Sequence, residues 1–295
     1  MTAPIPSQSG KPLLEVEGLS VRFPTRTRVV EAVRNISFSV GREKVGIVGE
    51  SGSGKTMTGR AVLGLIRPPG VVEARKMEFD GIDLRSLSEK QYRTIRGNRI
   101  AMVMQDPKFS LNPVMTVGRQ IAEAYRVHTK ASPSEARRRT LEMLEAVRIR
   151  DPERVYGAYP HEVSGGMGQR IMIAMMLIPD PDLLIADEPT SALDVTVQMQ
   201  VLAIIDDLVT QRGMGLMFIS HDLNLVASFC DRVVIMYAGQ IVETCRASEL
   251  HAAKHPYTRG LLASLPRVDQ PIQQLSTLTR DESWKTEPGV DARVL

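Results

Sequence analysis

Several features that mark other classes of protein are scarce in this chain. Its 295 residues include only two cysteines, Cys230 and Cys245, and these form no C-x-x-C motif. Two cysteines are too few for a disulfide framework and favour a reducing, cytoplasmic setting. The longest uninterrupted apolar run, 171–178, ends at Pro179 and is far shorter than the roughly 18 residues that a membrane span needs. The chain is therefore not expected to cross a bilayer by itself.

An excess of one charge sign is also missing. The 37 Lys and Arg residues and the 34 Asp and Glu residues leave a formal charge of +3, which is too small to argue for nucleic acid as a partner. Residues 1–12 are polar with two early prolines and lack the apolar segment of a secretory signal, so we expect a flexible lead there. With 43% hydrophobic and 24% charged residues, the chain has the composition of a globular protein of roughly two folding units.

Hydrophobic periodicity divides the chain into a β-rich first part and an alternating second part. Apolar residues alternate with other residues over much of 14–23 and 30–40, which predicts two half-buried strands. Over 117–149 the period becomes helical, so a helical insert interrupts the β-rich part. Beyond it strands and helices alternate, with near-continuous apolar strands such as 183–186 and 233–237. This alternation predicts a parallel sheet covered by helices on both faces.

One segment carries a complete phosphate-binding pattern. Residues 49–56 match G-x-x-x-x-G-K-[ST] between an expected strand, 45–48, and an expected helix, 55–66. The glycines allow backbone N–H groups to surround phosphate oxygens, Lys55 reaches the β- and γ-phosphates, and the Thr56 hydroxyl ligates Mg²⁺. The residues expected to bind nucleotide are Gly49, Glu50, Ser51, Gly52, Ser53, Gly54, Lys55, Thr56 and Thr58.

Two adjacent carboxylates, Asp187 and Glu188, follow the apolar strand 183–186. In an open parallel sheet, ligands bind beyond the carboxyl ends of the strands, so both side chains are expected beside the phosphate loop. Asp187 suits Mg²⁺ binding, and Glu188 suits a general base that orients or deprotonates the attacking water. An Asp-Glu pair without such a loop is more often a solvated turn.

A third motif, between these two, opens a helix. Residues 163–170 read Val-Ser-Gly-Gly-Met-Gly-Gln-Arg, which resembles the L-S-G-G-Q signature of ABC-transporter ATPases. A Ser-Gly-Gly sequence at a helix N-terminus can offer N–H groups to a phosphate, although by itself it is more often a plain helix cap. In this family the signature completes the nucleotide site of the opposite subunit in a head-to-tail dimer. The corresponding residues are Ser164, Gly165, Gly166 and Met167.

The order of the remaining motifs is also similar to that family. Gln105, after the strand 100–104, resembles the Q-loop glutamine that bridges water and Mg²⁺, and His221 resembles the switch histidine near the γ-phosphate. Phe23 stands where the family places an aromatic ring on adenine. Taken singly, these residues are more often a surface glutamine, a packing histidine and a strand core residue. The D-loop corresponds to Ser191, Ala192, Leu193 and Asp194.

The resemblance therefore implies a catalytic set and a metal-binding set. The expected catalytic residues are Lys55, Gln105, Glu188 and His221, and the expected Mg²⁺ ligands are Thr56, Gln105 and Asp187.

Over about residues 13–266, the chain resembles the oligopeptide/dipeptide/nickel importer branch of the family. The segments 105–117, 194–198 and 255–262, the last reading His-Pro-Tyr-Thr-Arg-Gly-Leu-Leu, carry this resemblance. The signature and the Met-Ile-Ala-Met that follows it resemble the first of the branch's two ATPase subunits. Two residues depart from the pattern: Gly168 stands where the branch commonly has Arg, and Val163 replaces Leu or Phe. Many relatives carry a C-terminal cysteine cluster thought to hold iron and sulfur, and none is predicted here because no cysteine follows Cys245.

The resemblance implies an α/β fold of the P-loop NTPase type, RecA-like. A mostly parallel sheet would carry an N-terminal antiparallel β subdomain and an inserted α-helical subdomain. The expected division is a flexible lead at 1–12, an ATPase core at 13–105 and 164–245, a helical subdomain at 106–163 and a partly disordered C-terminal extension at 246–295.

By the same resemblance, the chain binds and hydrolyses ATP with Mg²⁺ and energises a membrane importer of oligopeptides or dipeptides. It would be a peripheral protein on the cytoplasmic face of the inner membrane. The expected partners are a second ATPase subunit in a heterodimer, two permeases and, indirectly, a substrate-binding protein.

Two alternatives remain open. In the first, the importer carries nickel or another small solute. The chain can also be a soluble ABC ATPase that acts on DNA or the ribosome. However, the stretch 106–163 is too short for the coiled coil or zinc module of DNA-repair relatives, and ribosome-acting relatives carry two cassettes where this chain has one.

Overall fold

The chain forms two compact units. The computed structural model describes residues 11–105, 110–191, 193–264, 281–285 and 287–293. The first unit consists of residues 1–87 and 217–295, and the second of residues 88–216. Strand β9 (Gly215–Ser220) runs across the boundary in the sequence. The first unit is therefore discontinuous in the sequence, whereas the second is one continuous stretch.

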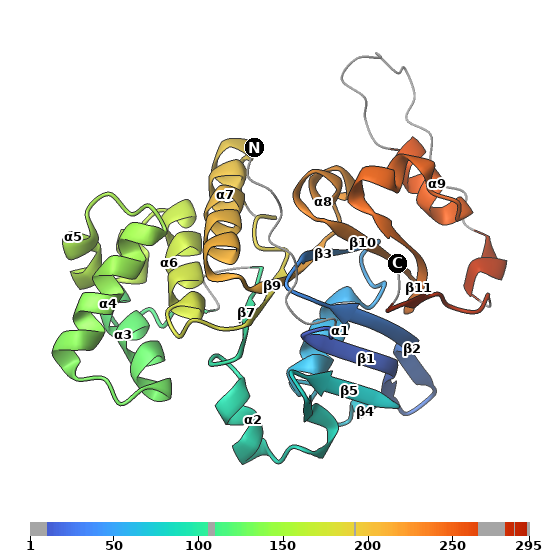
Figure 1. Ribbon diagram of the computed structural model, residues 1–295, viewed down its shortest axis with the longest axis horizontal. Helices are drawn as coiled ribbons and strands as arrows, with labels where there is room; N and C mark the ends of the chain where they lie inside the picture. Colours follow the sequence, from blue (N-terminus) through green and yellow to red (C-terminus); the bar gives the residue numbers. More distant parts are fainter. Residues whose placement is uncertain (1–10, 106–109, 192, 265–280, 286, 294–295) are drawn as a thin grey trace. The chain divides into compact units, whose positions relative to one another are not determined.

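An antiparallel sheet in the first unit forms around two long strands, β1 (Leu14–Pro24) and β2 (Val29–Val40) (Figure 1). Leu14 lies opposite Val40 on β2 and opposite Phe79 on β5 (Lys76–Phe79). The antiparallel N-terminal sheet expected from the sequence is thus confirmed. Shorter strands at its edges are β4 (Val71–Glu73), β6 (Ile82–Asp83) and β12 (Asp291–Ala292). The 3₁₀ turn η1 (Leu84–Ser86) directly follows β6 in the chain.

The alternation along β1 changes phase at one glycine. Val16 and Leu19 are both completely buried although they are three residues apart. Between them Gly18 has φ +65°, and the pairing register with β2 shifts there. A β-bulge of this kind inserts one extra residue into a strand, and a glycine accommodates the left-handed backbone. The bulge keeps both halves of the apolar pattern on the core side.

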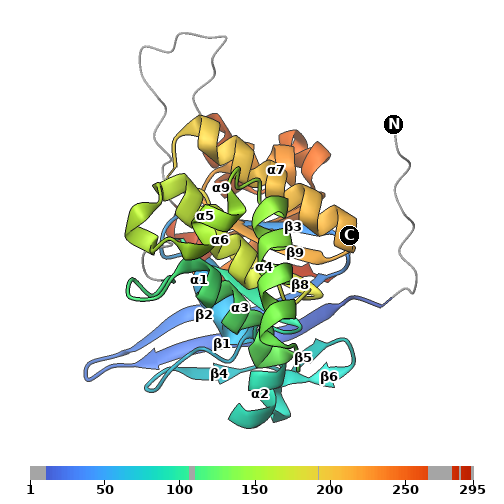
Figure 2. The same cartoon turned by 90° about the vertical axis from the view of Figure 1, so that its left-hand side faces the viewer.

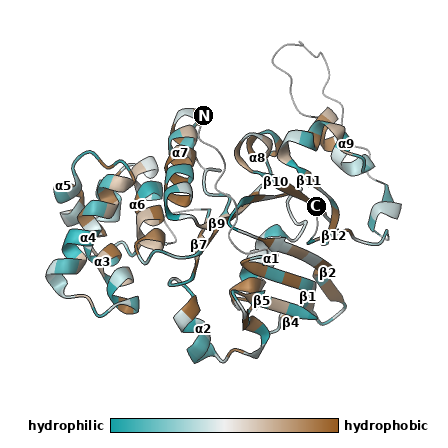
Figure 3. Ribbon diagram, in the orientation of Figure 1, coloured by the Kyte–Doolittle hydropathy of each residue, from teal (hydrophilic) through white to brown (hydrophobic). Residues whose placement is uncertain are grey.

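The first unit also contains three strands of mixed pairing. Strand β3 (Lys44–Val48) lies parallel to β10 (Arg232–Tyr237), with Ile47 opposite Val234, and β11 (Gln240–Arg246) pairs antiparallel with β10. All six residues of β10 are buried, and Figure 3 shows this strand as largely hydrophobic. The helical elements of this unit are α1 (Lys55–Val62), α8 (Leu223–Phe229), η4 (Ala247–Ala252), α9 (Pro256–Ala263) and η5 (Glu282–Lys285).

The second unit is mainly helical. Its helices α3 to α6 pack against one another, as the green and yellow-green helices of Figures 1 and 2 show. Strands β7 and β8 pair in parallel, with Ile100 opposite Leu183. The elements are α2 (Glu89–Ile95), β7 (Ile100–Val103), α3 (Val117–His128), α4 (Pro133–Ala146), α5 (Pro152–Gly157), η3 (Pro160–Glu162), α6 (Gly165–Leu177), β8 (Leu183–Asp187) and α7 (Val195–Arg212).

These observations confirm the α/β class with mixed sheets. The boundaries of the core and the helical subdomain that the sequence suggested stay a prediction. Helix α1 ends at Val62, earlier than expected, because Gly64 adopts a positive φ immediately after it. Residues 281–293, which follow a polar stretch, include a 3₁₀ turn and a strand that composition did not indicate. Within the described residues, no helix is both long and apolar enough to span a membrane.

One buried glutamine organises the loop before α3. The Gln120 side chain accepts a hydrogen bond from the Asn112 N–H at 2.8 Å. Its amide nitrogen donates to the carbonyl oxygens of Asn112 and Met115, both at 2.9 Å. Only 7% of Gln120 is exposed, so its amide is largely shielded from water and depends on these partners. The side chain thus adds three hydrogen bonds to the segment 112–115, in which the Asn112 side chain also accepts one from the Val114 N–H at 3.1 Å.

We expect Gln120→Leu to lower the free energy of unfolding by about 2–3 kcal/mol, because three part-buried hydrogen bonds to the backbone would be lost. Urea denaturation measures the change. The matched control is Gln200→Leu at an exposed position of α7, which should stay within about 0.5 kcal/mol of the unchanged protein. Equal destabilisation by the two variants would contradict the role given to Gln120.

Candidate active site

The phosphate-binding pattern lies where the sequence predicts it, between β3 and α1. Gly52 and Gly54 have φ values of +81° and +100°, which glycine adopts without the penalty of other residues. A Cβ on Gly49 would lie 2.1 Å from the Met236 carbonyl oxygen, and one on Gly54 would lie 2.4 Å from that of Ala32. Two of the pattern's glycines are therefore required by close contact with neighbouring backbone, and not only by a ligand.

Internal hydrogen bonds hold the loop. The Lys55 ammonium group donates to the carbonyl oxygens of Gly49 at 2.7 Å and Glu50 at 2.9 Å, and Lys55 is only 5% exposed. The Ser53 N–H donates to the Glu50 carbonyl at 3.1 Å, and the Ser53 carbonyl accepts from the Gly239 N–H at 3.1 Å. The loop is thus already curled, with its lysine folded over it.

The loop fits an anion. The Ser53 hydroxyl is buried and has no hydrogen-bond partner in the part of the chain that the structure describes. Helix α1 begins at Lys55 and has no acidic residue in its first turn, so its N-terminal N–H groups and dipole favour negative charge. A phosphate oxygen supplies the acceptor that both features need.

The two threonines of α1 differ in their surroundings. Thr56 is partly exposed, whereas Thr58 is completely buried and its hydroxyl donates to the Gly54 carbonyl at 3.0 Å. Thr58 therefore supports the start of the helix, and its contact with nucleotide stays a prediction. Among the other loop positions, Ser51 and Gly52 are exposed and Glu50 is partly buried.

In the second unit, the two carboxylates end a completely buried strand. Asp187 is the last residue of β8 and is 6% exposed. Glu188 follows with φ +48°, an unfavourable backbone for a residue that is not glycine. Its carbonyl oxygen accepts hydrogen bonds from the N–H and hydroxyl of Ser191, both at 3.3 Å. Strain of this kind costs about 1–3 kcal/mol and is concentrated at functional sites.

The signature residues begin helix α6. The Ser164 hydroxyl accepts a hydrogen bond from the Met167 N–H at 3.3 Å, so Ser164 is the N-cap of the helix. Gly165 is exposed, and a Cβ on Gly166 would lie 2.7 Å from a Val197 methyl group. The structure thus contains the helix cap that is the simpler explanation of the Ser-Gly-Gly sequence. Binding of phosphate by the same residues remains a prediction.

The D-loop leads from Glu188 to helix α7. Leu193 donates its N–H to the Thr190 carbonyl at 3.1 Å, and the Asp194 carboxylate caps α7 by accepting from the Val197 N–H at 3.0 Å. Ala192, the remaining residue of this motif, lies outside the described residues, as do Asp106 and Pro107 after Gln105.

Three further candidates lie at the ends or edges of strands. Gln105 is exposed shortly after β7, and His221 is exposed directly after β9. Phe23 is partly buried near the end of β1, where its ring would clash with any side chain on Gly70, since a Cβ there would lie 2.7 Å away. None of these positions by itself distinguishes a catalytic from a structural residue.

The candidates are divided between the two units. The first unit holds the phosphate loop, Phe23 and His221, and the second holds Gln105, the signature, the two carboxylates and the D-loop. Thr56, Gln105 and Asp187 offer hydroxyl, amide and carboxylate oxygens, the hard donors that Mg²⁺ prefers. No group of three or more His, Cys, Asp or Glu side chains suited to a metal occurs within the described ranges.

The two cysteines are poorly ionised. Burial raises the pKa of the Cys230 thiol to about 12 and that of Cys245 to about 11. Thiolates are the form that binds metals and reacts with electrophiles, so at neutral pH both thiols are weak in either role.

Sequence reasoning missed two residues of this region. The buried Gln169 of α6 donates from its amide nitrogen to the Pro189 carbonyl, next to Glu188. Tyr257 of α9 accepts a hydrogen bond at its hydroxyl from the Glu50 N–H at 3.2 Å. Neither contact has a local sequence signal, because each joins residues that are distant in the chain.

The phosphate loop, the carboxylates after a buried parallel strand and the helix that begins with Ser-Gly-Gly are the motifs of an ATP-binding cassette. The sequence profile of the ABC transporter family matches residues 33–191, which is more than half of the chain. This chain belongs to the ABC transporter family, as an ATP-binding member.

Curated relatives are similar over most of their length. The dipeptide transport ATP-binding protein of Escherichia coli (strain K12) is 49% identical over 268 residues, which cover 90% of this chain and 82% of the relative. The oligopeptide transport ATP-binding protein of Bacillus subtilis (strain 168) is 49% identical over 87% of this chain and 73% of the relative.

Solved structures share the fold. A dimeric ATP-binding cassette in a post-hydrolysis state with ADP and Pi superposes with a TM-score of 0.71 at 25% identity, over 79% of this chain and 98% of that one. The cbiO1 protein of Clostridium perfringens, part of an ABC transporter complex, gives a TM-score of 0.70 at 25% identity, over 82% of this chain and 91% of that one.

Proposed function

We propose that this chain is the ATP-hydrolysing subunit of a membrane importer whose cargo is oligopeptides or dipeptides. The observation that carries this proposal is the complete phosphate loop, curled around Lys55, in a chain that is 49% identical to a dipeptide transport ATP-binding protein over 90% of its length. Nickel or another small solute remains the alternative cargo, because the solute is not recognised by the ATPase subunit.

The loop residues bind and orient the nucleotide in this proposal. The N–H groups of the loop and of the first turn of α1 surround the β- and γ-phosphates, and the Lys55 ammonium moves from the carbonyls of Gly49 and Glu50 to phosphate oxygens. The Phe23 ring stacks on the adenine. Mg²⁺, held by Thr56, Asp187 and Gln105, would neutralise charge on the phosphates.

Glu188 is the proposed general base. Water attacks the γ-phosphorus, its proton passes to the Glu188 carboxylate, and the bond from this phosphorus to the bridging oxygen breaks to give ADP and phosphate. His221 orients the same water or the γ-phosphate. The strained backbone at Glu188 supports this role, because such strain persists only where the surrounding structure enforces it.

The signature acts on a second subunit. Ser164, Gly165, Gly166 and Met167 would complete the nucleotide site of a partner ATPase, so that ATP closes a head-to-tail dimer and hydrolysis reopens it. The dimeric state of the similar cassette with ADP and Pi supports this arrangement. We propose a heterodimer with a second ATPase, bound to two permeases on the cytoplasmic face of the inner membrane. A substrate-binding protein would deliver the cargo.

We expect Lys55→Ala to abolish tight ATP binding, because it removes both the charge for the phosphates and the hydrogen bonds that curl the loop. Equilibrium binding of a fluorescent ATP analogue to the purified chain measures this. Lys90→Ala, at an exposed lysine of α2, is the control and should bind like the unchanged protein. Unchanged affinity in Lys55→Ala would refute the assignment of the loop.

Glu188→Gln should retain ATP binding and slow hydrolysis by roughly 10² or more, as expected for the loss of a positioned base. Phosphate release from the assembled transporter is the measurement. Glu123→Gln on α3 removes an exposed carboxylate and should leave the rate unchanged. Full turnover in Glu188→Gln would assign the base to another group.

Two variants of Ser164 separate the helix cap from phosphate binding. Glycine serves as an N-cap almost as well as serine, whereas alanine costs about 1 kcal/mol. We therefore expect Ser164→Gly to keep the thermal midpoint and still lower ATP turnover of the assembled transporter, whereas Ser164→Ala lowers both. Normal turnover in Ser164→Gly would leave Ser164 with its capping role alone.

Affinity purification of the tagged chain from its native membranes in mild detergent tests the whole proposal, with partners identified by mass spectrometry. Two permeases and a second ATPase are the expected partners. Recovery with ribosomes or DNA-processing factors, and without an integral membrane protein, would overturn the importer and favour a soluble ABC ATPase.

A further inference from the structure

One peptide group at the start of the phosphate loop is held from both sides. The Gly49 carbonyl oxygen accepts a hydrogen bond from the Lys55 ammonium at 2.7 Å, and the N–H of the same peptide group, on Glu50, donates to the Tyr257 hydroxyl at 3.2 Å. A peptide group is planar, so its orientation is fixed once both polar atoms are bound. The position of Tyr257 therefore bears on the carbonyl that holds the catalytic lysine.

Tyr257 is itself rigidly placed. It is completely buried near the start of α9, and the His255 ring caps this helix by accepting the Tyr257 N–H at its Nδ1 atom, at 3.1 Å. Pro256 occupies the first turn of the helix, where its missing N–H costs nothing. The Tyr257 ring packs against Tyr237 at a centroid distance of 4.5 Å and against Trp284 at 6.2 Å.

Trp284 belongs to residues 281–285 and 287–293, here called the C-terminal segment. Several contacts attach this segment to the rest of the first unit. Strand β12 pairs in parallel with β2, and the Val290 N–H donates to the Ile241 carbonyl at 2.7 Å. The buried Arg232 donates to the Ala292 carbonyl at 2.8 Å.

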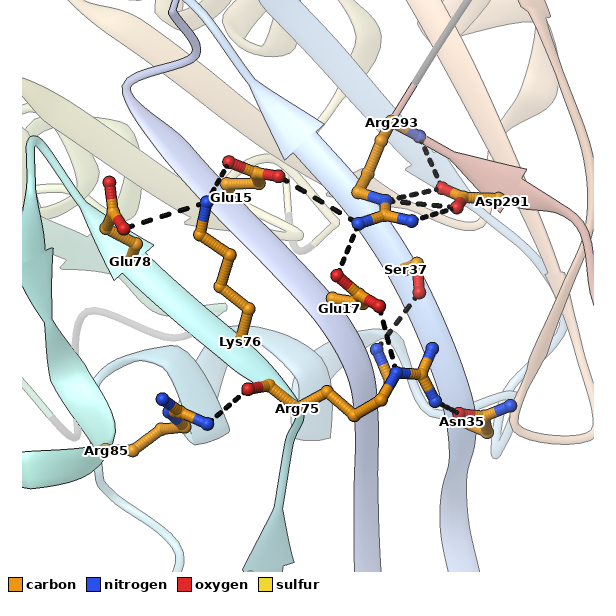
Figure 4. A network of polar contacts seen from close by, with 11 residues as sticks. Glu15, Glu17, Asn35, Ser37, Arg75, Lys76, Glu78, Arg85, Asp291 and Arg293 are labelled. Atoms are coloured by element: carbon orange, nitrogen blue, oxygen red, sulfur yellow. Dashed lines mark hydrogen bonds and ion pairs between the residues drawn. The ribbon is translucent and has the colours of Figure 1, made fainter.

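Arg293 adds a charged attachment. Its guanidinium donates to the Glu17 carboxylate of β1 at 2.6 Å and to Asp291, and Glu17 also binds Arg75, as Figure 4 shows. The paired arginines lower the pKa of Glu17. Nearer to the aromatic residues, the His255 ring lies 3.3 Å from the Glu287 carboxylate. Contacts at Glu287 and over 290–293 thus attach the segment beside Tyr257, and the Trp284 ring packs on the Tyr257 ring.

We propose that Tyr257 is a positioning residue of the nucleotide site: its hydroxyl orients the Gly49–Glu50 peptide group, and the C-terminal segment keeps it in place through Trp284. This inference rests on the proposed ATP binding by the loop. It also gives the His-Pro-Tyr motif a physical role, in which histidine caps the helix, proline starts it and tyrosine reaches the loop.

The consequence is preorganisation. A loop already in its binding conformation loses little conformational entropy when nucleotide binds, and a loop that lacks one of the two hydrogen bonds to this peptide group loses more. The Tyr257 hydroxyl should therefore raise the affinity for ATP. It should have little effect on the rate of the chemical step, because it touches neither the γ-phosphate nor the attacking water.

The test compares two variants, each of which removes one tyrosine hydroxyl from the same aromatic cluster. Tyr257→Phe removes the hydrogen bond to Glu50 and keeps the ring. Tyr237→Phe is the matched control, since Tyr237 is also buried and its ring packs against that of Tyr257. We expect Tyr257→Phe to raise the Kd for ATP of the purified full chain about three- to tenfold, the usual effect of one hydrogen bond, and Tyr237→Phe to change it less than twofold.

Amide hydrogen exchange gives a measurement that would not change if Tyr257 had only a structural role. The Glu50 amide of the nucleotide-free chain should exchange several-fold faster in Tyr257→Phe and at the normal rate in Tyr237→Phe, with similar thermal midpoints for the two variants. Equal Kd values and equal exchange in the two variants would overturn the proposal, as would tighter ATP binding by Tyr257→Phe.

A third variant tests the C-terminal segment. Trp284→Ala should raise the Kd for ATP as Tyr257→Phe does. The Kd of the double variant should not exceed the higher Kd of the two single variants, because both substitutions act through one hydrogen bond. Trp284→Phe, which keeps a ring, should restore most of the affinity. Additive effects would remove the C-terminal segment from the proposal. Failure of the unchanged chain to bind ATP would refute the proposed function itself, which is a different outcome.

Discussion

The close approach of backbone to backbone around residues 49–54 is the constraint on which the site depends. Met236 and Ala32 present carbonyl oxygens so near to Gly49 and Gly54 that neither position has room for a Cβ. The loop can curl only because its glycines yield this space. Within this curl the Ser53 hydroxyl is buried and has no hydrogen-bond partner among the residues that the structure describes. The steric need for glycine and the fit to an anion thus occur in the same short loop, which explains why the pattern is so specific.

The two carboxylates, Asp187 and Glu188, are positioned in a different way, at the end of a buried strand. Five buried residues of β8 fix where the strand stops, so the core that packs around this strand positions Asp187 and, directly after it, the strained Glu188. Gln169 then holds the Pro189 carbonyl next to them. The apolar core around β8 thus determines where the carboxylate of Asp187 lies.

Local patterns predicted many of the elements, and the phosphate-binding pattern lies between a strand and a helix as expected. Strand alternation in 14–23, helical periodicity in 117–149 and the loop at 49–56 each depend on neighbours in the sequence, so the residues themselves reveal them. The α/β class followed from the order of these elements. The contact between Tyr257 and Glu50, the bonds of Gln120 and the pairing of β12 with β2 join residues that no periodicity relates. Such contacts become visible only when the chain has been folded in space.

The division of the chain has a consequence for its biosynthesis. The first unit needs residues 1–87 and 217–295, and the intervening stretch, 88–216, belongs to the second. During translation at about 5–20 residues per second, the N-terminal strands must wait on the order of ten seconds for their partners to be made. Strand β12 and Arg293, which bind β2 and Glu17, are synthesised after the whole of the second unit. The nascent N-terminal strands are therefore exposed to chaperones, or to aggregation, until these later residues have been translated.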